Sequence, residues 1–297
     1  MIENYLEYST CLWALIPSRD YIALRDRFLD DPEDIHVRQQ TDWYYYAQTH
    51  AREYILEAQE KGVEFFDIVD YNAANYRIFD SWNSEMGDGV IHLDSESFGA
   101  TSVAVNVPLA KDYVQANTYC TDPSHNHIDE ERLVDASTGI LCESTFFFKG
   151  QNHEATARND VVMRLAIRIL TDASFTDVYS DPAYPQFNFA RDSSSARILY
   201  NAYRNLDTSE LSAEDAAEFK SAYADLGAAL ESTYMPTEEF NEKTERFENI
   251  VNKINSNDEE ENKGTNAFLS FFAKIFKFLS DMFLKFFGGK GFSDILK

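Results

Sequence analysis

The chain has 297 residues, of which 44% are hydrophobic and 14% aromatic, and it carries a formal net charge of −25. This apolar content is enough to bury the core of one large domain with appendages, and it excludes a disordered acidic polymer. The excess of acidic residues also argues against sequence-independent binding of nucleic acid, because phosphate contacts need Lys and Arg side chains.

The first residues and the cysteines leave the localisation open. Met1–Leu6 has neither the basic stretch nor the apolar run of a secretory signal peptide, so none is predicted in this chain, although an intact parent could be secreted or lie at the cell surface. Cys11, Cys120 and Cys142 allow at most one intrachain disulfide and identify no compartment.

Residues 1–192 are predicted to form a mixed α/β domain. Strand-like runs rich in aromatic and β-branched residues occur at Val63–Val69, Val103–Val107 and Thr145–Lys149. The segment Ala157–Thr171 has the periodicity of a helix lying on a sheet, with one apolar face formed by Val161, Leu165 and Ile169. A strand, a short loop and such a helix make an α/β building unit.

Residues 193–255 are predicted to form a helical hairpin or small bundle. Three helices are expected, at Ser193–Leu206, Ser212–Ser232 and Thr237–Asn255. Ser212 and Thr237 have the character of N-caps. The run 256–264 is rich in acidic residues and is predicted to be a solvated linker.

The terminal segment 265–297 is predicted to contain an amphipathic helix over Phe268–Phe287. Its polar residues fall in one narrow sector at 100° per residue, and phenylalanines cover much of the rest. From residue 264 onward there are five Lys against two Asp, a net of +3. This helix could lie in a lipid or membrane surface, or it could pack its apolar face on a protein.

Asp88 and His153 are the candidate catalytic residues. Asp88 lies between two glycines, where it could orient a histidine or simply be a turn residue that binds its own backbone. His153 follows the predicted strand Thr145–Lys149 at a strand-to-helix corner, where it could be a general base or a capping residue.

Three other histidines are candidate metal ligands. His125 and His127, followed by Asp129, could bind a metal, and His92 could approach them through the fold. The spacing favours two solvated or mutually hydrogen-bonded histidines instead. The sequence therefore predicts no metal site and no cofactor.

Two segments resemble the C-terminal portion of a bacterial α/β-hydrolase of the lipase and esterase kind. Gly87–Ser95 resembles the loop that bears the acid of this family. Phe147–Glu154 and Asn159–Val162 resemble its last core strand, histidine loop and closing helix. The order agrees, because the family runs from nucleophile to acid to histidine.

The resemblance covers roughly residues 1–190, since Ser9–Pro17 and Tyr21–Leu29 look like the lid or cap region of such lipases. It implies a partial α/β-hydrolase sheet with flanking helices, in which Asp88 is the triad acid and His153 the base. The first strands, the oxyanion loop and the Gly-x-Ser-x-Gly elbow of the family would lie upstream of Met1.

No serine in this sequence has the setting of a nucleophile elbow. Asp135–Gly139 resembles one superficially, but it has Asp in place of the first glycine and leads into a strand, so Ser137 is a poor nucleophile candidate. We therefore expect a lipase- or esterase-like chain that is an incomplete or inactive hydrolase by itself. Its intact form would cleave a small ester or a lipid. The alternative is a non-catalytic, membrane- or surface-associated binding protein.

Overall fold

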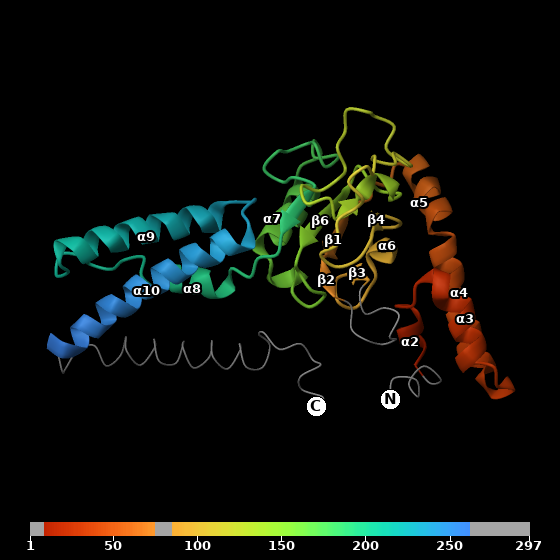
Figure 1. The fold of residues 1–297 in the computed structure, drawn as a ribbon, viewed down its shortest axis with the longest axis horizontal. Coiled ribbons are helices and arrows are strands. Elements are labelled where there is room, and N and C mark those ends of the chain that lie inside the picture. The colour runs from red at the N-terminus through yellow and green to blue at the C-terminus, as the bar shows by residue number, and fades with distance from the viewer. Residues whose placement is uncertain (1–8, 75–84, 262–297) are drawn as a thin grey trace. The chain divides into compact units, whose positions relative to one another are not determined.

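The computed structural model describes residues 9–74 and 85–261 (Figure 1). The amphipathic segment 268–287 therefore lies outside the described residues. The chain divides into two compact units between Asp192 and Ser193, which is the boundary expected from the sequence. Among the described helices, none is both long and apolar enough to cross a membrane.

The first unit begins with helices and continues with short strands. Its helices are α2 (Thr10–Trp13), α3 (Ser18–Phe28), α4 (Ile35–Thr49), α5 (Ala51–Glu60), α6 (Leu93–Glu96) and α7 (Asp160–Thr171). Its strands are β1 (Asp67–Tyr71), β2 (Ala73–Ala74), β3 (Met86–Gly87), β4 (Thr101–Ser102), β5 (Val134–Asp135), β6 (Thr145–Lys149) and β7 (Phe187–Phe189). The class is mixed α/β with a small parallel sheet, as expected.

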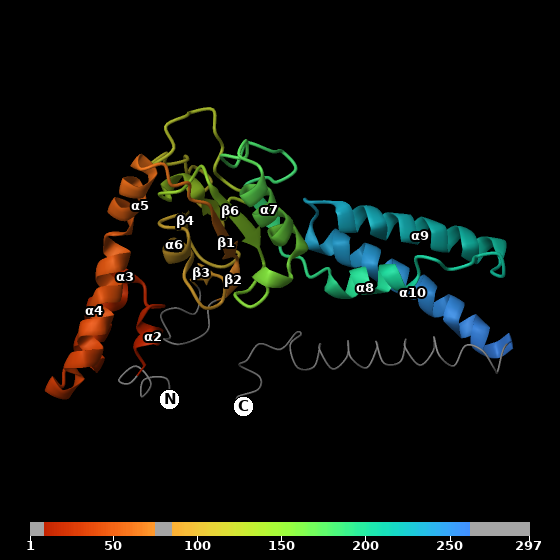
Figure 2. The ribbon, with the colours of Figure 1, turned by 180° about the vertical axis from the view of Figure 1, so that it is seen from behind.

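The main sheet has the order β1-β6-β7, and both of its strand pairs are parallel. Successive side chains of a strand point to opposite faces, so Phe146 and Phe148 pack against α7, whereas Phe147 packs on the other side against Val69 and Leu93. Burial on both faces explains why β6 is continuously aromatic. Figures 1 and 2 show α7 and α6 beside this sheet.

The observed strands correct two expectations. The strand expected at Val63–Val69 lies at Asp67–Tyr71, because its buried residues continue to Tyr71 while Val63 is exposed. The strand expected at Val103–Val107 is wrong, since Asn106 takes a left-handed φ of 58° and both valines are exposed. The nearby strand Thr101–Ser102 pairs with β5, and within Val103–Val107 there is a single isolated bridge, between Ala104 and Val107.

The helix expected from Ala157 begins instead at Asp160, because Asn159 is its N-cap and accepts a hydrogen bond from the amide of Val161 (3.0 Å). A 3-10 turn, Thr156–Arg158, precedes the cap. The strand Thr145–Lys149 and the helical character of the segment that follows it are confirmed.

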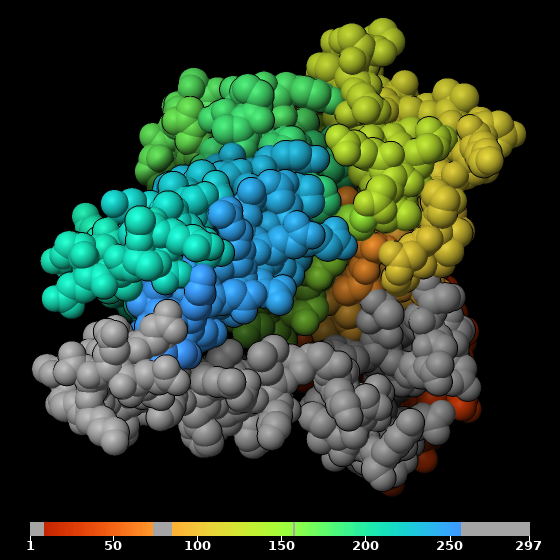
Figure 3. Space-filling model, turned by 60° about the vertical axis from the view of Figure 1, so that its left-hand side comes forward, coloured from red at the N-terminus to blue at the C-terminus, as the bar shows by residue number. Residues whose placement is uncertain are grey.

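The second unit consists of α8 (Ser194–Ala202), α9 (Ala213–Glu231) and α10 (Thr237–Glu261). Ser212 caps α9 as expected, by accepting a hydrogen bond from the amide of Asp215. The helix expected to end at Asn255 continues to Glu261, through most of the segment 256–264 predicted as a linker. The helices α9 and α10 lie side by side (Figure 3) around a core that includes Leu226 and Phe247.

Candidate active site

A loop that follows β6 carries His153, and the sheet fixes where this loop starts. Gly150 turns the chain with a φ of 74°, a conformation that favours glycine. Its amide donates a hydrogen bond to the carbonyl of Tyr71 (2.7 Å), so the loop leaves the sheet between the carboxyl ends of β1 and β6. Ligand and catalytic groups in α/β proteins gather at this edge of a parallel sheet.

A buried polar network holds the same loop to β1 and α7. The side-chain amide of Gln151 donates to Oδ1 of Asp70 (2.6 Å). The side-chain amide of Asn159 donates in turn to Oε1 of Gln151 (2.6 Å). The hydroxyl of Thr156 also donates to Asp70. Asp70, Gln151 and Asn159 are at most 2% exposed. Because each buried polar group has a partner, the network makes the loop rigid.

Asp88 follows β3 directly and is 1% exposed. Gly89 takes a φ of 99°, and the chain then turns so that the amides of Val90 and Ile91 both donate to Oδ1 of Asp88 at 2.7 Å. The side chain is therefore a turn residue that binds its own backbone. Its second oxygen, Oδ2, stays available for another partner.

Oδ2 of Asp88 lies 2.5 Å from Nδ1 of His153. The two residues are also joined through the backbone, since the amide of His153 donates to the carbonyl of Asp88 (2.8 Å). The His153 side chain is 48% exposed, in contrast to its buried partner. The structure thus brings together the two residues that were expected to pair.

This geometry fixes the chemistry available to the imidazole. An ionised carboxylate only accepts hydrogen bonds, so a neutral His153 ring facing it carries its proton on Nδ1 and presents the lone pair of Nε2. Asp88 can then orient the ring and stabilise the imidazolium that forms when Nε2 takes a proton. Because half of the ring is exposed, solvent or a bound reactant can reach it.

Burial raises the pKa of two other carboxyl groups near Asp88. Burial raises the pKa of Glu96 to about 10, and the charges of Asp88 and Asp70 add to this effect. Burial also raises the pKa of Asp70 to about 6, against the hydrogen bonds from Thr156 and Gln151. The acidic residues around the site therefore do not all carry charge together.

In the part of the chain that the structure describes, no serine, threonine or cysteine side chain hydrogen-bonds to His153. Ser137, the poor elbow candidate, is 0% exposed, and its hydroxyl accepts a hydrogen bond from the amide of Asn117 (2.9 Å). Its carbonyl accepts from Tyr119. Ser137 therefore holds a loop in place and is not accessible to a substrate.

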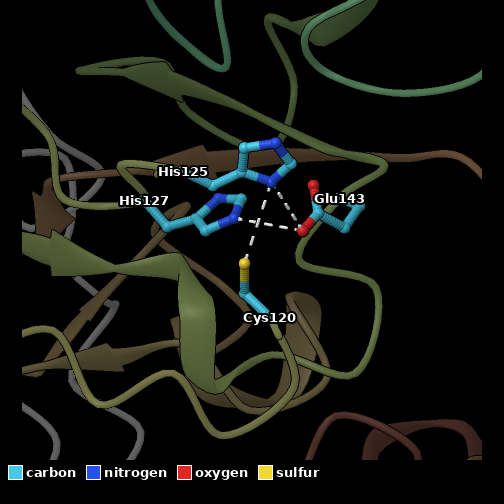
Figure 4. Close-up of side chains that lie close together, drawn as sticks. All are labelled: Cys120, His125, His127 and Glu143. Atoms are coloured by element: carbon cyan, nitrogen blue, oxygen red, sulfur yellow. Dashed lines mark hydrogen bonds and ion pairs between the residues drawn. The ribbon is translucent and has the colours of Figure 1, made fainter. Parts of the chain in front are cut away.

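The three histidines weighed as metal ligands lie in two different places. His125 and His127 lie together, but their neighbours are Cys120 and Glu143 (Figure 4). Asp129, the expected third ligand, is elsewhere, because its Oδ1 accepts from the amides of Leu133 and Val134. His92 lies 2.6 Å from Glu85 and does not join this group.

The sequence interpretation missed both Cys120 and Glu143 as neighbours of these histidines. The spacing Cys120-x4-His125-x-His127 was the available signal for the cysteine. Glu143 is brought to the cluster by the turn before β6, which no local pattern indicates.

Comparison of the chain with protein-family models, with curated proteins and with solved structures gave no match. The functional interpretation therefore depends on the geometry of the described residues.

Proposed function

We propose that this chain provides the acid and the base of a serine hydrolase of the α/β-hydrolase type, acting on ester bonds, with Asp88 as acid and His153 as base. The observation that carries the proposal is the contact of 2.5 Å between Oδ2 of Asp88 and Nδ1 of His153. It occurs at the carboxyl ends of adjacent parallel strands, β1 and β6, in the order expected for this class.

In this mechanism, Nε2 of His153 takes the proton of a serine hydroxyl as that oxygen attacks the ester carbonyl. The same nitrogen then returns the proton to the leaving alcohol, and the acyl-enzyme is hydrolysed by water in a second round. No serine of the sequence has the Gly-x-Ser-x-Gly setting, so we propose that the chain by itself is inactive as an ester hydrolase.

The state of the His153 ring tests the roles of acid and base without requiring turnover. In Asp88→Asn, the amide oxygen stays with Val90 and Ile91, so the NH2 group faces Nδ1 of His153. The ring must then accept at Nδ1 and carry its proton on Nε2, which is the wrong tautomer for a base.

Nitrogen-15 NMR of the ring should therefore show an Nδ1–H tautomer in the native chain and an Nε2–H tautomer in Asp88→Asn. His153→Gln assigns the signals, and Asp94→Asn is a control for a nearby acid. The same tautomer in the native chain and in Asp88→Asn would refute the assigned roles.

Turnover of a short-chain p-nitrophenyl ester and labelling by a fluorophosphonate test the activity. We expect neither with purified 1–297. If the purified chain did turn over the ester and one serine were labelled, loss of turnover in both His153→Ala and Asp88→Asn would support the assigned acid and base. The labelled serine would then be the nucleophile within this chain. Turnover that survives both substitutions would place catalysis elsewhere and overturn the proposal.

A further inference from the structure

Four side chains that can each bind a metal ion lie together beside the sheet, at a place that the proposed hydrolase chemistry does not use. They are Cys120, His125, His127 and Glu143, and each can offer an atom within 4.8 Å of the other three. Figure 4 shows the thiol, both imidazoles and the carboxylate directed toward a common point. We propose that these four residues bind one structural Zn²⁺ ion.

The distances already approach those of a tetrahedral zinc site. With zinc–ligand bonds of about 2.0 to 2.3 Å, ligand atoms at tetrahedral angles lie about 3.3 to 3.8 Å apart. Oε1 of Glu143 lies 3.1 Å from Nδ1 of His125 and 3.5 Å from Nε2 of His127. Sγ of Cys120 lies 3.8 Å from Nδ1 of His125. Small side-chain movements are enough to bring the four ligand atoms to the spacing of a tetrahedral site.

A buried hydrogen-bond chain fixes the orientation of His127, whose side chain is 0% exposed. The amide nitrogen of Gln186 donates to the carbonyls of Cys142 (2.7 Å) and Thr145 (3.1 Å). The amide oxygen of Gln186 must therefore accept from Nδ1 of His127, at 2.8 Å. In its neutral form the ring then presents its Nε2 lone pair toward Oε1 of Glu143 and the hydroxyl of Tyr179, each 3.5 Å away.

A lone pair and a carboxylate are both acceptors, so a cation between them makes this arrangement favourable. His125 shows the same organisation, because Nδ1 faces the cluster and Nε2 lies 3.6 Å from a carboxylate oxygen of Asp122 on the outside. Outer groups of this kind orient metal-ligating histidines in known sites. The His125 and Glu143 side chains are 29% and 38% exposed, which gives an ion access from solvent.

The donor set selects the metal and its role. One sulfur, two imidazole nitrogens and one carboxylate oxygen suit Zn²⁺, whereas Ca²⁺ and Mg²⁺ prefer oxygen ligands throughout. Four protein ligands complete a tetrahedron and leave no position for a substrate, so the ion is structural. It would tie the loop of Cys120 to the turn that contains Glu143 and leads directly into β6.

The test uses the purified full chain, freed of any affinity tag and stripped with a chelator. Competition with a chromophoric chelator should show one Zn²⁺ bound per chain. Co²⁺ in place of zinc should give the intense visible bands of tetrahedral cobalt and a near-ultraviolet thiolate charge-transfer band. Failure to bind zinc, or an octahedral cobalt spectrum without the charge-transfer band, would overturn the proposal.

Variants identify the ligands. Cys120→Ser should remove the charge-transfer band, while Cys11→Ser, which alters an exposed thiol, and Cys142→Ser should retain it. Retention of the band in Cys120→Ser, or its loss in Cys142→Ser instead, would refute the assigned thiolate.

The surface residue Asp122 gives a variant that should keep the fold. Asp122→Asn preserves an acceptor for Ser124 but removes the charge beside His125, and should weaken zinc binding about 10-fold. His36→Ala, at an exposed histidine, is the matched control and should not change the affinity. Unchanged zinc affinity in Asp122→Asn would refute the role given to His125.

Discussion

The two histidine sites of residues 1–192 differ in how much of the imidazole they leave open. The His153 side chain is 48% exposed and is held through Nδ1 by Asp88, whereas the His127 side chain is 0% exposed and has polar neighbours at both nitrogens. A base must exchange protons with a reactant, so it needs one accessible nitrogen. A structural role requires no accessible nitrogen, so the His127 side chain can be completely buried.

The two sites also differ in which part of the histidine is held by neighbouring side chains, the backbone or the imidazole. A network around Asp70 and Gln151 supports the backbone of the loop that carries His153, so the imidazole itself keeps a free edge. Gln186 binds the imidazole of His127 directly. Both histidines have a neighbouring acid, so the difference between the two roles proposed for them depends on the rest of their environment.

The largest expected difference in stability between the two sites follows from removing the imidazole ring of each histidine. His127→Ala leaves a buried cavity and an unpaired Gln186 oxygen, so it should lower the free energy of unfolding by about 3 kcal/mol. His153→Ala removes a half-exposed ring but leaves the buried Oδ2 of Asp88 without this partner, so it should cost about 1 to 2 kcal/mol.

Urea unfolding in the presence of a chelator measures both variants without a contribution from bound metal. Tryptophan fluorescence reports the first unit alone, because Trp13, Trp43 and Trp82 all lie in residues 1–192. Equal losses of stability in His127→Ala and His153→Ala would remove the distinction between the two sites.

A smaller effect tests whether the buried network makes the His153 loop rigid. Asn159→Ala removes the cap of α7 and leaves Oε1 of Gln151 without its donor, so it should cost about 2 kcal/mol. Asn152→Ala, at an exposed position of the same loop, is the control and should cost less than about 0.5 kcal/mol.

Urea unfolding measures this pair of variants as well, and the NMR signals of the His153 ring should weaken or broaden in Asn159→Ala. Native stability together with an unchanged ring spectrum in that variant would show that the network does not position the base.

The sequence predicted the His153 site better than the cysteine and histidine cluster, and the reason is physical. Asp88 lies in a glycine-flanked turn that the sequence marks, and the strand Thr145–Lys149 fixes the start of the histidine loop. By contrast, Glu143 reaches His125 through a tertiary turn, and Asp129, which is closer in sequence, is used to bind backbone amides. Tertiary hydrogen bonds therefore determine that Glu143, and not Asp129, is the acid next to His125.

The errors in strand assignment have a related cause. Val103–Val107 has the composition of a strand, but a left-handed Asn106 and exposed valines show that loop geometry prevailed over propensity. In β1, Asp67 and Asp70 interrupt the apolar pattern, so its true extent to Tyr71 was not evident from the sequence. A buried acid within a strand is predictable only when its partners, here Gln151 and Thr156, are known.

A different kind of effect, on the pH dependence of stability, concerns Glu96, whose buried carboxyl group lies near the charge of Asp88. In the folded chain the pKa of Glu96 is about 10, and burial is its largest cause. An unfolded glutamic acid loses its proton near pH 4.3. Between these values the folded state therefore binds one more proton than the unfolded state, and this contribution to the free energy of unfolding is lost as pH rises.

The slope is at most about 1.4 kcal/mol per pH unit for one proton. Glu96→Gln keeps the shape of the neutral acid and removes the titration, so the free energy of unfolding should fall less steeply between pH 5 and 9. Urea unfolding by tryptophan fluorescence at several pH values measures both slopes. Parallel slopes for the native chain and the variant would show that Glu96 is ionised in the folded state, and Asp88 would then share its surroundings with a second negative charge.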